Sequence, residues 1–190
     1  YLRAANVSWG VLSFEDVKTM HFEPDEVERF KLRAGDILLG EASGSQFEVG
    51  KSGVWSEELY NCCFQNTLIR VRPIFPEMAD YLQRHYFRNA NNGDFGRASK
   101  GTGIHHIGAQ KLETWPVALP PLSEQSELVN SLDRMLSNMT NLASLLERTK
   151  DRRASLEQSI LAKAFRGELV PQDPNDEPAS VLLERIRAER

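Results

Sequence analysis

The feature that most constrains this chain is a helical spacing of apolar residues that begins after two consecutive prolines, Pro120 and Pro121. Apolar residues then recur three or four positions apart, the spacing of a coiled-coil seam, at Val129, Leu132, Leu136, Met139, Ala143 and Leu146. Polar Lys150 and Arg153 interrupt the seam, which resumes at Ile160 and Ala164. Ser123 is a suitable N-cap and Gly167 a suitable stop. The pattern predicts one long helix over residues 123–165.

The length of this helix has a consequence for its surroundings. It would extend roughly 65 Å at ~1.5 Å per residue, whereas a domain of about 120 residues has a diameter of roughly 35 Å. Part of the helix would then extend beyond its own domain, and its apolar residues would need a second helix to cover them. The alternative is that the stripe packs on the domain throughout, with a kink near Lys150.

The residues on either side of this helix indicate an α+β protein in three parts. Residues 1–122 form a mixed α/β globular domain, residues 123–166 the long coiled-coil-forming helix, and residues 167–190 a proline-rich strap with a short C-terminal helix over residues 179–189. In the first part we expect strands at residues 1–7, 54–55 and 62–71, a strand, a turn at Gly35 and Asp36 and a second, buried strand within residues 30–39, and a helix at residues 78–87. Residues 89–106 are nearly all loop formers, and so long a loop usually has a function.

The charge is distributed unevenly along the chain. The whole chain has 23 Lys and Arg against 27 Asp and Glu, a net charge of −4, which argues against a protein that coats nucleic acid through bulk positive charge. Residues 70–111, however, carry seven basic and three acidic side chains. This local surplus surrounds the polar loop at residues 89–106.

Two glycine-rich segments supply hydrogen-bond donors of the kinds that contact phosphates and base edges. Residues 40–53 offer Ser43, Ser45 and Lys51, and the second segment offers Arg97, Ser99, Lys100, Thr102, His105 and His106, with Arg70 and Arg72 close in sequence. These residues are the candidate DNA contacts. A solvated loop without a ligand is the alternative.

Other chemistries find little support. Cys62 and Cys63 are adjacent, so they suit neither an ordinary disulfide nor a zinc site, and a reducing cytoplasm is expected. No apolar run is long enough to span a membrane. Gly50, Lys51 and Ser52 match the end of a phosphate-binding loop, but the motif requires glycine where Ser45 stands. A nucleotide-binding or hydrolytic enzyme built on this loop is kept as an alternative, as is a coiled-coil adaptor that does not bind DNA.

Several segments together resemble the specificity subunit of a Type I restriction-modification system. Residues 119–125 read LPPLSEQ, residues 158–172 read QSILAKAFRGELVPQ, and residues 173–187 read DPNDEPASVLLERIR. Residues 35–39 (GDILL), residues 64–66 (FQN) and the glycine-rich run before Ile107 resemble a target recognition domain of that family. The similarity covers nearly the whole chain and is most specific at its C-terminal end.

The resemblance implies a non-catalytic subunit that binds no cofactor itself. A full-length member has two target recognition domains, each reading half of a bipartite DNA sequence, and two long helices that pack antiparallel. Methyltransferase subunits that use S-adenosylmethionine bind this framework, and ATP-driven restriction subunits can join.

The present chain has one domain and one long helix, and it begins with Tyr1 rather than Met. We therefore expect the C-terminal half of a longer subunit. Two copies would pair their long helices antiparallel about a two-fold axis.

Overall fold

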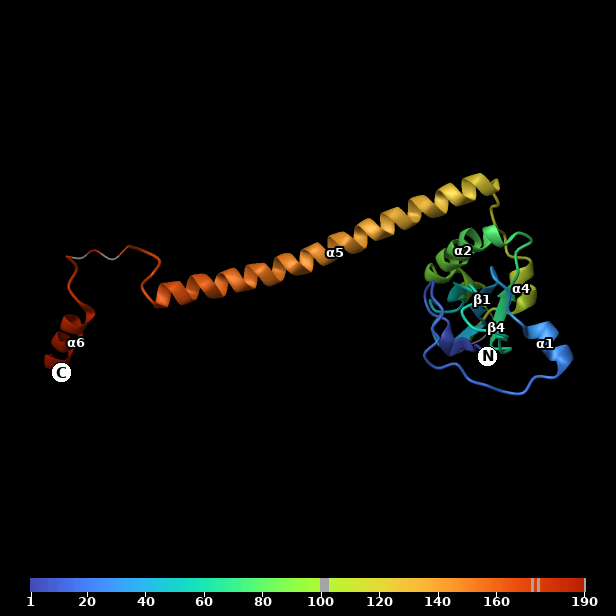
Figure 1. Cartoon of the computed structure of the whole chain (residues 1–190), viewed down its shortest axis with the longest axis horizontal. Helices are drawn as coiled ribbons and strands as arrows, with labels where there is room; N and C mark the ends of the chain where they lie inside the picture. Colours follow the sequence, from blue (N-terminus) through green and yellow to red (C-terminus); the bar gives the residue numbers. More distant parts are fainter. Residues whose placement is uncertain (100–102, 172, 174, 190) are drawn as a thin grey trace. The chain divides into compact units, whose positions relative to one another are not determined.

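The computed structural model covers the whole chain and describes all residues except 100–102, 172, 174 and 190. The chain divides into two compact units, Tyr1–Arg134 and Met135–Arg190. The first unit holds the strands and the shorter helices, and the second holds most of the long helix and the C-terminal helix (Figure 1).

The first unit is built around a small antiparallel sheet. Strand β1 (Ile37–Gly40) lies between β3 (Ser52–Val54) and β4 (Leu68–Val71), with Ile37 opposite both Val54 and Val71. Side chains of Ile37, Leu38 and Leu39 are fully buried because β1 is the central strand. Successive side chains of a strand point to opposite faces, so β1 contributes to two cores.

Each face of β1 has its own apolar cluster. Ile37 and Leu39 pack with Leu82 and Tyr86 of α2 (Ala79–Asn91) and with Phe95. Leu38 packs on the other side, in a cluster completed by Leu2, Leu32, Trp55, Phe64 and Leu68. The expected α+β class is confirmed.

The remaining elements of the first unit are short. They are η1 (Ala4–Asn6), α1 (Pro24–Phe30), β2 (Ala42–Ser43), η2 (Pro76–Met78), α3 (Asp94–Ala98), β5 (His105–His106) and α4 (Ala109–Glu113).

Three expectations for the local structure were wrong in part. Residues 1–7 contain a 3₁₀ turn flanked by isolated bridges rather than a strand. The strand expected at residues 62–71 is regular only over β4, since Cys63 and Phe64 form single bridges. The loop expected at residues 89–106 contains the end of α2, all of α3 and β5. Gly93, with φ +72°, makes the turn between α2 and α3, and buried Phe95 anchors α3.

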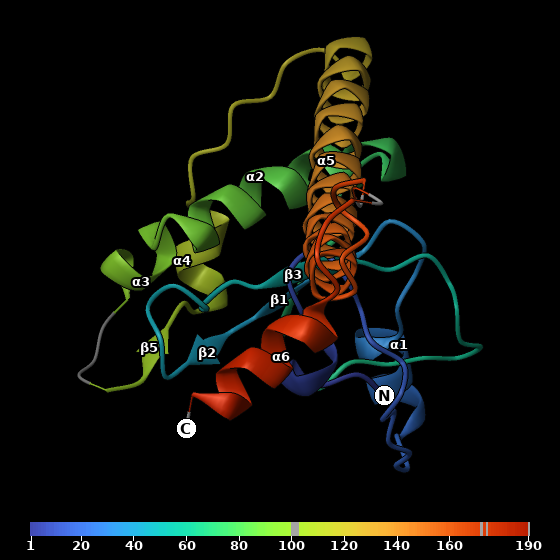
Figure 2. The same ribbon diagram turned by 90° about the vertical axis from the view of Figure 1, so that its left-hand side faces the viewer.

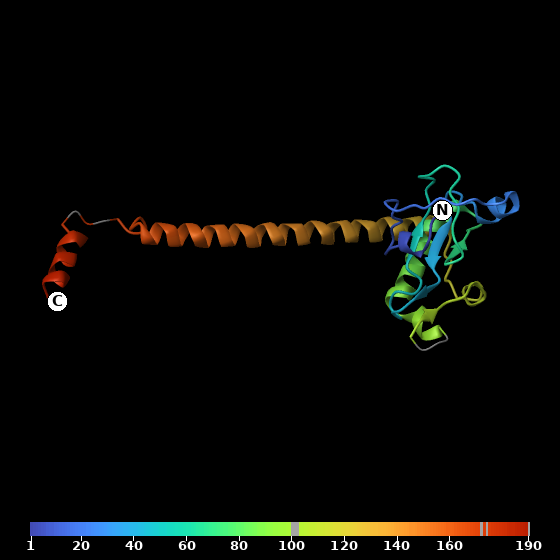
Figure 3. The ribbon, with the colours of Figure 1, turned by 90° about the horizontal axis from the view of Figure 1, so that it is seen from below.

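The long helix α5 spans Leu122–Phe165, 44 residues, close to the predicted 123–165 (Figure 3). It begins one residue early, so Ser123 lies inside the helix and the N-cap prediction was wrong. It continues as one helix through Lys150, whose Nζ bonds Glu147 Oε1 at 2.7 Å, and the kink considered there does not occur. Gly167 has φ +70° just beyond the end, the conformation that commonly terminates helices.

The C-terminal helix α6 spans Ala179–Ala188, also close to expectation. No helix in the described part of the chain is both long and apolar enough to cross a membrane.

Candidate nucleic-acid interface

The two polar segments singled out from the sequence meet in a short antiparallel ribbon. Ser43 of β2 lies opposite His105 of β5, and Ala42 lies opposite His106 (Figure 2). The amide of Ile107 also donates to the carbonyl of Glu41 at 2.9 Å. The ribbon therefore brings together residues about 60 positions apart in the sequence.

Glycines let helix α3 pack directly against the turn that follows β2. A Cβ at Gly96 would overlap the backbone of Gln46, and a Cβ at Gly50, whose φ is +82°, would overlap the ring of Phe95. The first polar segment is thus held against α3 by backbone contact, and its position depends on the absence of side chains at these two residues.

Hydrogen bonds within the first segment fix its polar side chains. Ser43 Oγ donates to Glu48 Oε2 at 3.2 Å and accepts from the amide of Ser45 at 3.2 Å. Lys51 Nζ bonds Glu48 Oε1 at 2.7 Å and lies 5.5 Å from the ring centroid of Trp9. The bond from Lys51 lowers the pKa of Glu48 below its usual value. Lys51 is therefore paired in the structure.

The second segment is similarly ordered where the structure describes it. Ser99 Oγ donates to the carbonyl of Gly96 at 2.6 Å and lies 3.1 Å from His105 Nδ1. His106 Nε2 lies 3.5 Å from Glu41 Oε1, and Arg97 pairs with Asp94. Lys100 and Thr102 lie outside the described residues.

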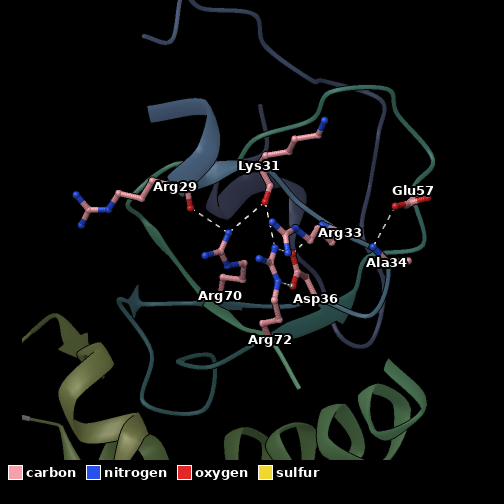
Figure 4. Close-up of polar contacts among 8 residues, drawn as sticks. All are labelled: Arg29, Lys31, Arg33, Ala34, Asp36, Glu57, Arg70 and Arg72. Atoms are coloured by element: carbon pink, nitrogen blue, oxygen red, sulfur yellow. Dashed lines mark hydrogen bonds and ion pairs between the residues drawn. The ribbon is translucent and has the colours of Figure 1, made fainter. Parts of the chain in front are cut away.

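The candidates Arg70 and Arg72 lie in a different cluster (Figure 4). Arg72 makes two bonds to the fully buried carboxylate of Asp36, at 2.6 and 2.7 Å. Arg70 donates to the carbonyls of Arg29 and Lys31, at 3.0 and 3.1 Å. Asp36 directly precedes β1, whereas the ribbon follows β1, so these arginines join α1 to the sheet and are not part of the ribbon.

Sequence reasoning missed a set of donors beside the ribbon. A hollow next to His106 is lined also by Gln110, Lys111 and Thr114 of the α4 region. Within the described residues no carboxylate pairs with Lys111, and its side chain is exposed. The signal that could have found it is its place in the basic stretch at residues 70–111.

The Gly50–Ser52 segment does not form a phosphate-binding loop. Such a loop leads into a helix whose first amides bind the phosphates, but Ser52 begins strand β3 and is fully buried. The nucleotide-site alternative was therefore wrong. The described residues also contain no group of three His, Cys, Asp or Glu side chains that could hold a metal ion.

Helix α5 exposes a broad apolar surface. Of the predicted seam residues, Leu132, Leu136, Met139, Leu146 and Ile160 are all more than a third exposed, and Val129 is partly buried. Ala143 and Ala164 are exposed as well. The prediction missed a second row, Leu128, Met135, Leu142 and Leu156, that is exposed to a similar degree. Together the rows make a face wider than a two-helix seam.

No protein-family model matches the chain. Curated proteins do match it, however. Over its full length, the chain is 30% identical to the Type I restriction enzyme EcoKI specificity subunit of Escherichia coli K12, and the match covers 43% of that protein. Over 91% of its length, the chain is 28% identical to the Type I restriction enzyme StySPI specificity subunit of Salmonella potsdam, and the match covers 40% of that protein. A stretch of 35 residues is 69% identical to part of the EcoAI specificity subunit of Escherichia coli.

These matches agree with the resemblance seen in the sequence motifs. The chain spans less than half the length of the curated relatives that it matches. It is related over its whole length to the specificity subunits of Type I restriction enzymes.

Proposed function

We propose that this chain is a non-catalytic subunit that recognises one half of a bipartite DNA sequence in a Type I restriction-modification complex. The observation that carries the proposal is the similarity, over the full length of the chain, to proteins named specificity subunits. Residues 1–122 would read the DNA, residues 123–166 would set the spacing, and residues 167–190 would complete the framework.

The β2–β5 ribbon supplies the chemistry for base reading. Ser43, Ser45, Ser99, His105 and His106 offer hydroxyl and imidazole groups that can both donate and accept hydrogen bonds to base edges. Close packing of the glycine positions around Gln46 and Phe95 holds these groups in place. A rigid array of short polar side chains suits sequence reading better than bulk attraction to phosphate.

The electrostatics of the ribbon favour weak binding by the chain alone. Lys51, Arg97 and His106 each lie beside a carboxylate of Glu48, Asp94 or Glu41. Phosphate contacts provide most of the sequence-independent affinity of DNA-binding proteins. Methyltransferase subunits would therefore supply most of the backbone attraction, and restriction subunits would join the same assembly.

The exposed face of α5 supports the scaffolding part of the proposal. Its predicted seam would pair with the same helix of a second copy, antiparallel about a two-fold axis. The second row, with Leu128, Met135 and Leu142, leaves apolar surface for a further helix. That surface fits the methyltransferase subunits as a second neighbour.

The test of DNA recognition uses the chain together with its methyltransferase subunits. Genome-wide mapping of methylated sites should show one bipartite motif, and His105→Ala with His106→Ala should alter or abolish it, at both halves where two copies of this chain form the framework. Lys18→Ala, an exposed residue that pairs with Asp16, is the control and should leave the motif unchanged. If the histidine variant methylates the same motif as the unsubstituted chain, the ribbon does not recognise bases.

A second measurement separates phosphate contact from base reading. Lys111→Ala should weaken binding to all sequences about equally and lower the slope of log K against log salt by roughly 1. No footprint on any DNA in the full complex would instead favour the coiled-coil adaptor.

A further inference from the structure

The first unit contains an apolar groove whose lining includes no residue of the β2–β5 ribbon. It has a volume of about 580 Å³ and opens between β4, α2, α4 and the segment at residues 115–119. Its apolar walls include Val71, Leu82, Leu112, Trp115 and Leu119, and Arg70 and Arg72 also line it. Leu119 and nearby Ile74 are 58% and 87% exposed.

The segment that borders this groove is firmly held. Tyr81 of α2 donates its hydroxyl to the carbonyl of Ala118 at 2.9 Å, and the ring of Trp115 packs edge-on against Phe95 with the ring centroids 4.6 Å apart. The groove is therefore a formed surface of the first unit. It lies immediately before the start of α5, because Leu119 precedes Leu122 by three residues.

The other end of the chain carries an apolar helix without a cover. In α6, Val181, Leu182, Leu183 and Ile186 are each 41–54% exposed. Leu182, Leu183 and Ile186 share one face by helical spacing. The preceding strap, residues 166–178, contains four acidic side chains and one basic one. This charge is opposite to that of Arg70, for which the described residues contain no paired carboxylate, whereas Arg72 is paired with Asp36 and Glu113 also lines the groove.

The lengths of α5 and of the strap decide whether α6 can reach the groove of its own chain or that of a second copy. Helix α5 is about 65 Å long at ~1.5 Å per residue, and the strap at residues 166–178 spans at most about 50 Å when fully extended. The strap therefore cannot carry α6 back to Leu122 of its own chain. In an antiparallel pair, however, Phe165 of one copy lies beside Leu122 of the other, at a helix separation of roughly 8–10 Å.

We propose that α6 of one copy docks into the groove of a second copy, with Leu182, Leu183 and Ile186 against Trp115 and Leu119 and with the acidic strap near Arg70 and Arg72. The docking rests on the antiparallel homodimer proposed above. Each copy would then bind the other at two places, along α5 and through its C-terminal helix.

The test is disulfide trapping in the full chain. The variant Leu119→Cys with Leu183→Cys should form a covalent dimer under mild oxidation, visible on a non-reducing gel. The matched control, Leu119→Cys with Glu184→Cys, places the second thiol on the opposite face of α6 and should form far less. Native Cys62 and Cys63 are buried, and the unsubstituted chain provides the baseline.

Light scattering on the same samples separates the two proposals. A dimer by mass without the Leu183 cross-link overturns the docking and leaves the homodimer standing. An intramolecular disulfide in place of the covalent dimer also overturns it. A monomer at high concentration overturns both, while the methylation map still tests DNA recognition. If the docking holds, Leu183→Asp should raise the dimer dissociation constant at least about tenfold.

Discussion

The two units use the same kinds of apolar side chain in opposite ways. In the first unit, Trp55 and Phe95 are almost entirely buried among residues far apart in the sequence. In the second unit, Met139, Leu142 and Leu145 are each more than half exposed on a regular helix. The first unit therefore buries its large apolar side chains among one another, whereas the second leaves a row of them exposed.

The chain offers a simple way to observe the units separately. All three tryptophans, Trp9, Trp55 and Trp115, lie in the first unit. Their fluorescence during denaturant unfolding therefore reports on that unit alone, whereas far-ultraviolet circular dichroism reports on helices of both units.

The largest effect is expected from Phe95→Ala. The ring is fully buried and packs against Tyr86, Trp115 and the backbone at Gly50, so removing it should cost about 3–5 kcal/mol of the first unit's stability. The control is the same substitution at Phe165, which is 90% exposed and should leave the tryptophan-detected transition within about 0.5 kcal/mol. Equal losses in the two variants would contradict the contrast between the units.

A smaller loss is expected from Asp36→Asn. The substitution keeps the shape of the side chain but leaves Arg72 without its buried carboxylate, and because Arg72 is itself about a third exposed, we expect about 2 kcal/mol. Asp16→Asn is the control, because that carboxylate is well exposed beside Arg3 and Lys18. Urea unfolding followed by fluorescence measures the stability of both variants. An unchanged midpoint for Asp36→Asn would show that the pairing of Asp36 with Arg72 does not stabilise the first unit.

A modest pH dependence should arise at His85. Burial lowers the pKa of this imidazole, while its contact with the carbonyl of Pro116 opposes the shift. The unfolded chain then binds the proton more readily, so stability is lost as the pH falls below about 6.5 toward the folded-state pKa. Unfolding midpoints at pH 7 and pH 5 should differ less in His85→Gln. If the midpoint changes by the same amount between pH 7 and pH 5 in His85→Gln and in the unsubstituted chain, His85 does not contribute to the loss of stability at low pH.

The smallest effect on the first unit should come from the double variant Leu136→Asp, Met139→Asp. Both side chains lie beyond Arg134 and are exposed, so the tryptophan-detected transition should shift by less than about 0.5 kcal/mol. The same variant should be a monomer by light scattering, because it places charge on the proposed seam.

The matched control for the seam variant is Ser137→Asp with Asn141→Asp. Both residues are exposed positions of α5 on the face opposite the two apolar rows, so the control adds the same two negative charges away from the seam. It should keep the mass of the unsubstituted chain. A dimer in the seam variant, or dissociation of both variants alike, would count against pairing through these rows.

The parts that the sequence predicts well depend on local periodicity. The spacing around Leu132, Leu136 and Met139, with Gly167 beyond, places α5 within a residue at each end. The ribbon could not be predicted in this way, because the pairing of Ser43 with His105 is a long-range contact. It depends on Gly96 approaching the backbone of Gln46, which no local pattern reveals.

The two arginines show why proximity in sequence was misleading for the candidate site. Arg70 lies in β4 and Arg72 directly follows it, and the strand carries them toward Lys31 and Asp36. A count of the basic stretch alone treats their charge as available for DNA. A buried acid elsewhere in the chain, Asp36, binds one of them, and only the fold shows that pairing.

The ring of Phe95 touches the glycine before β3 and the tryptophan that leads toward α5. Both ends of the turn that follows β2 are thus fixed, at the ribbon and at this ring, while Gly44 has open space around it. Residues at the tip of that turn could therefore be exchanged without disturbing the core, and under the proposed function the DNA sequence that is read would change with them. New specificities would arise by substitution between two fixed anchor points.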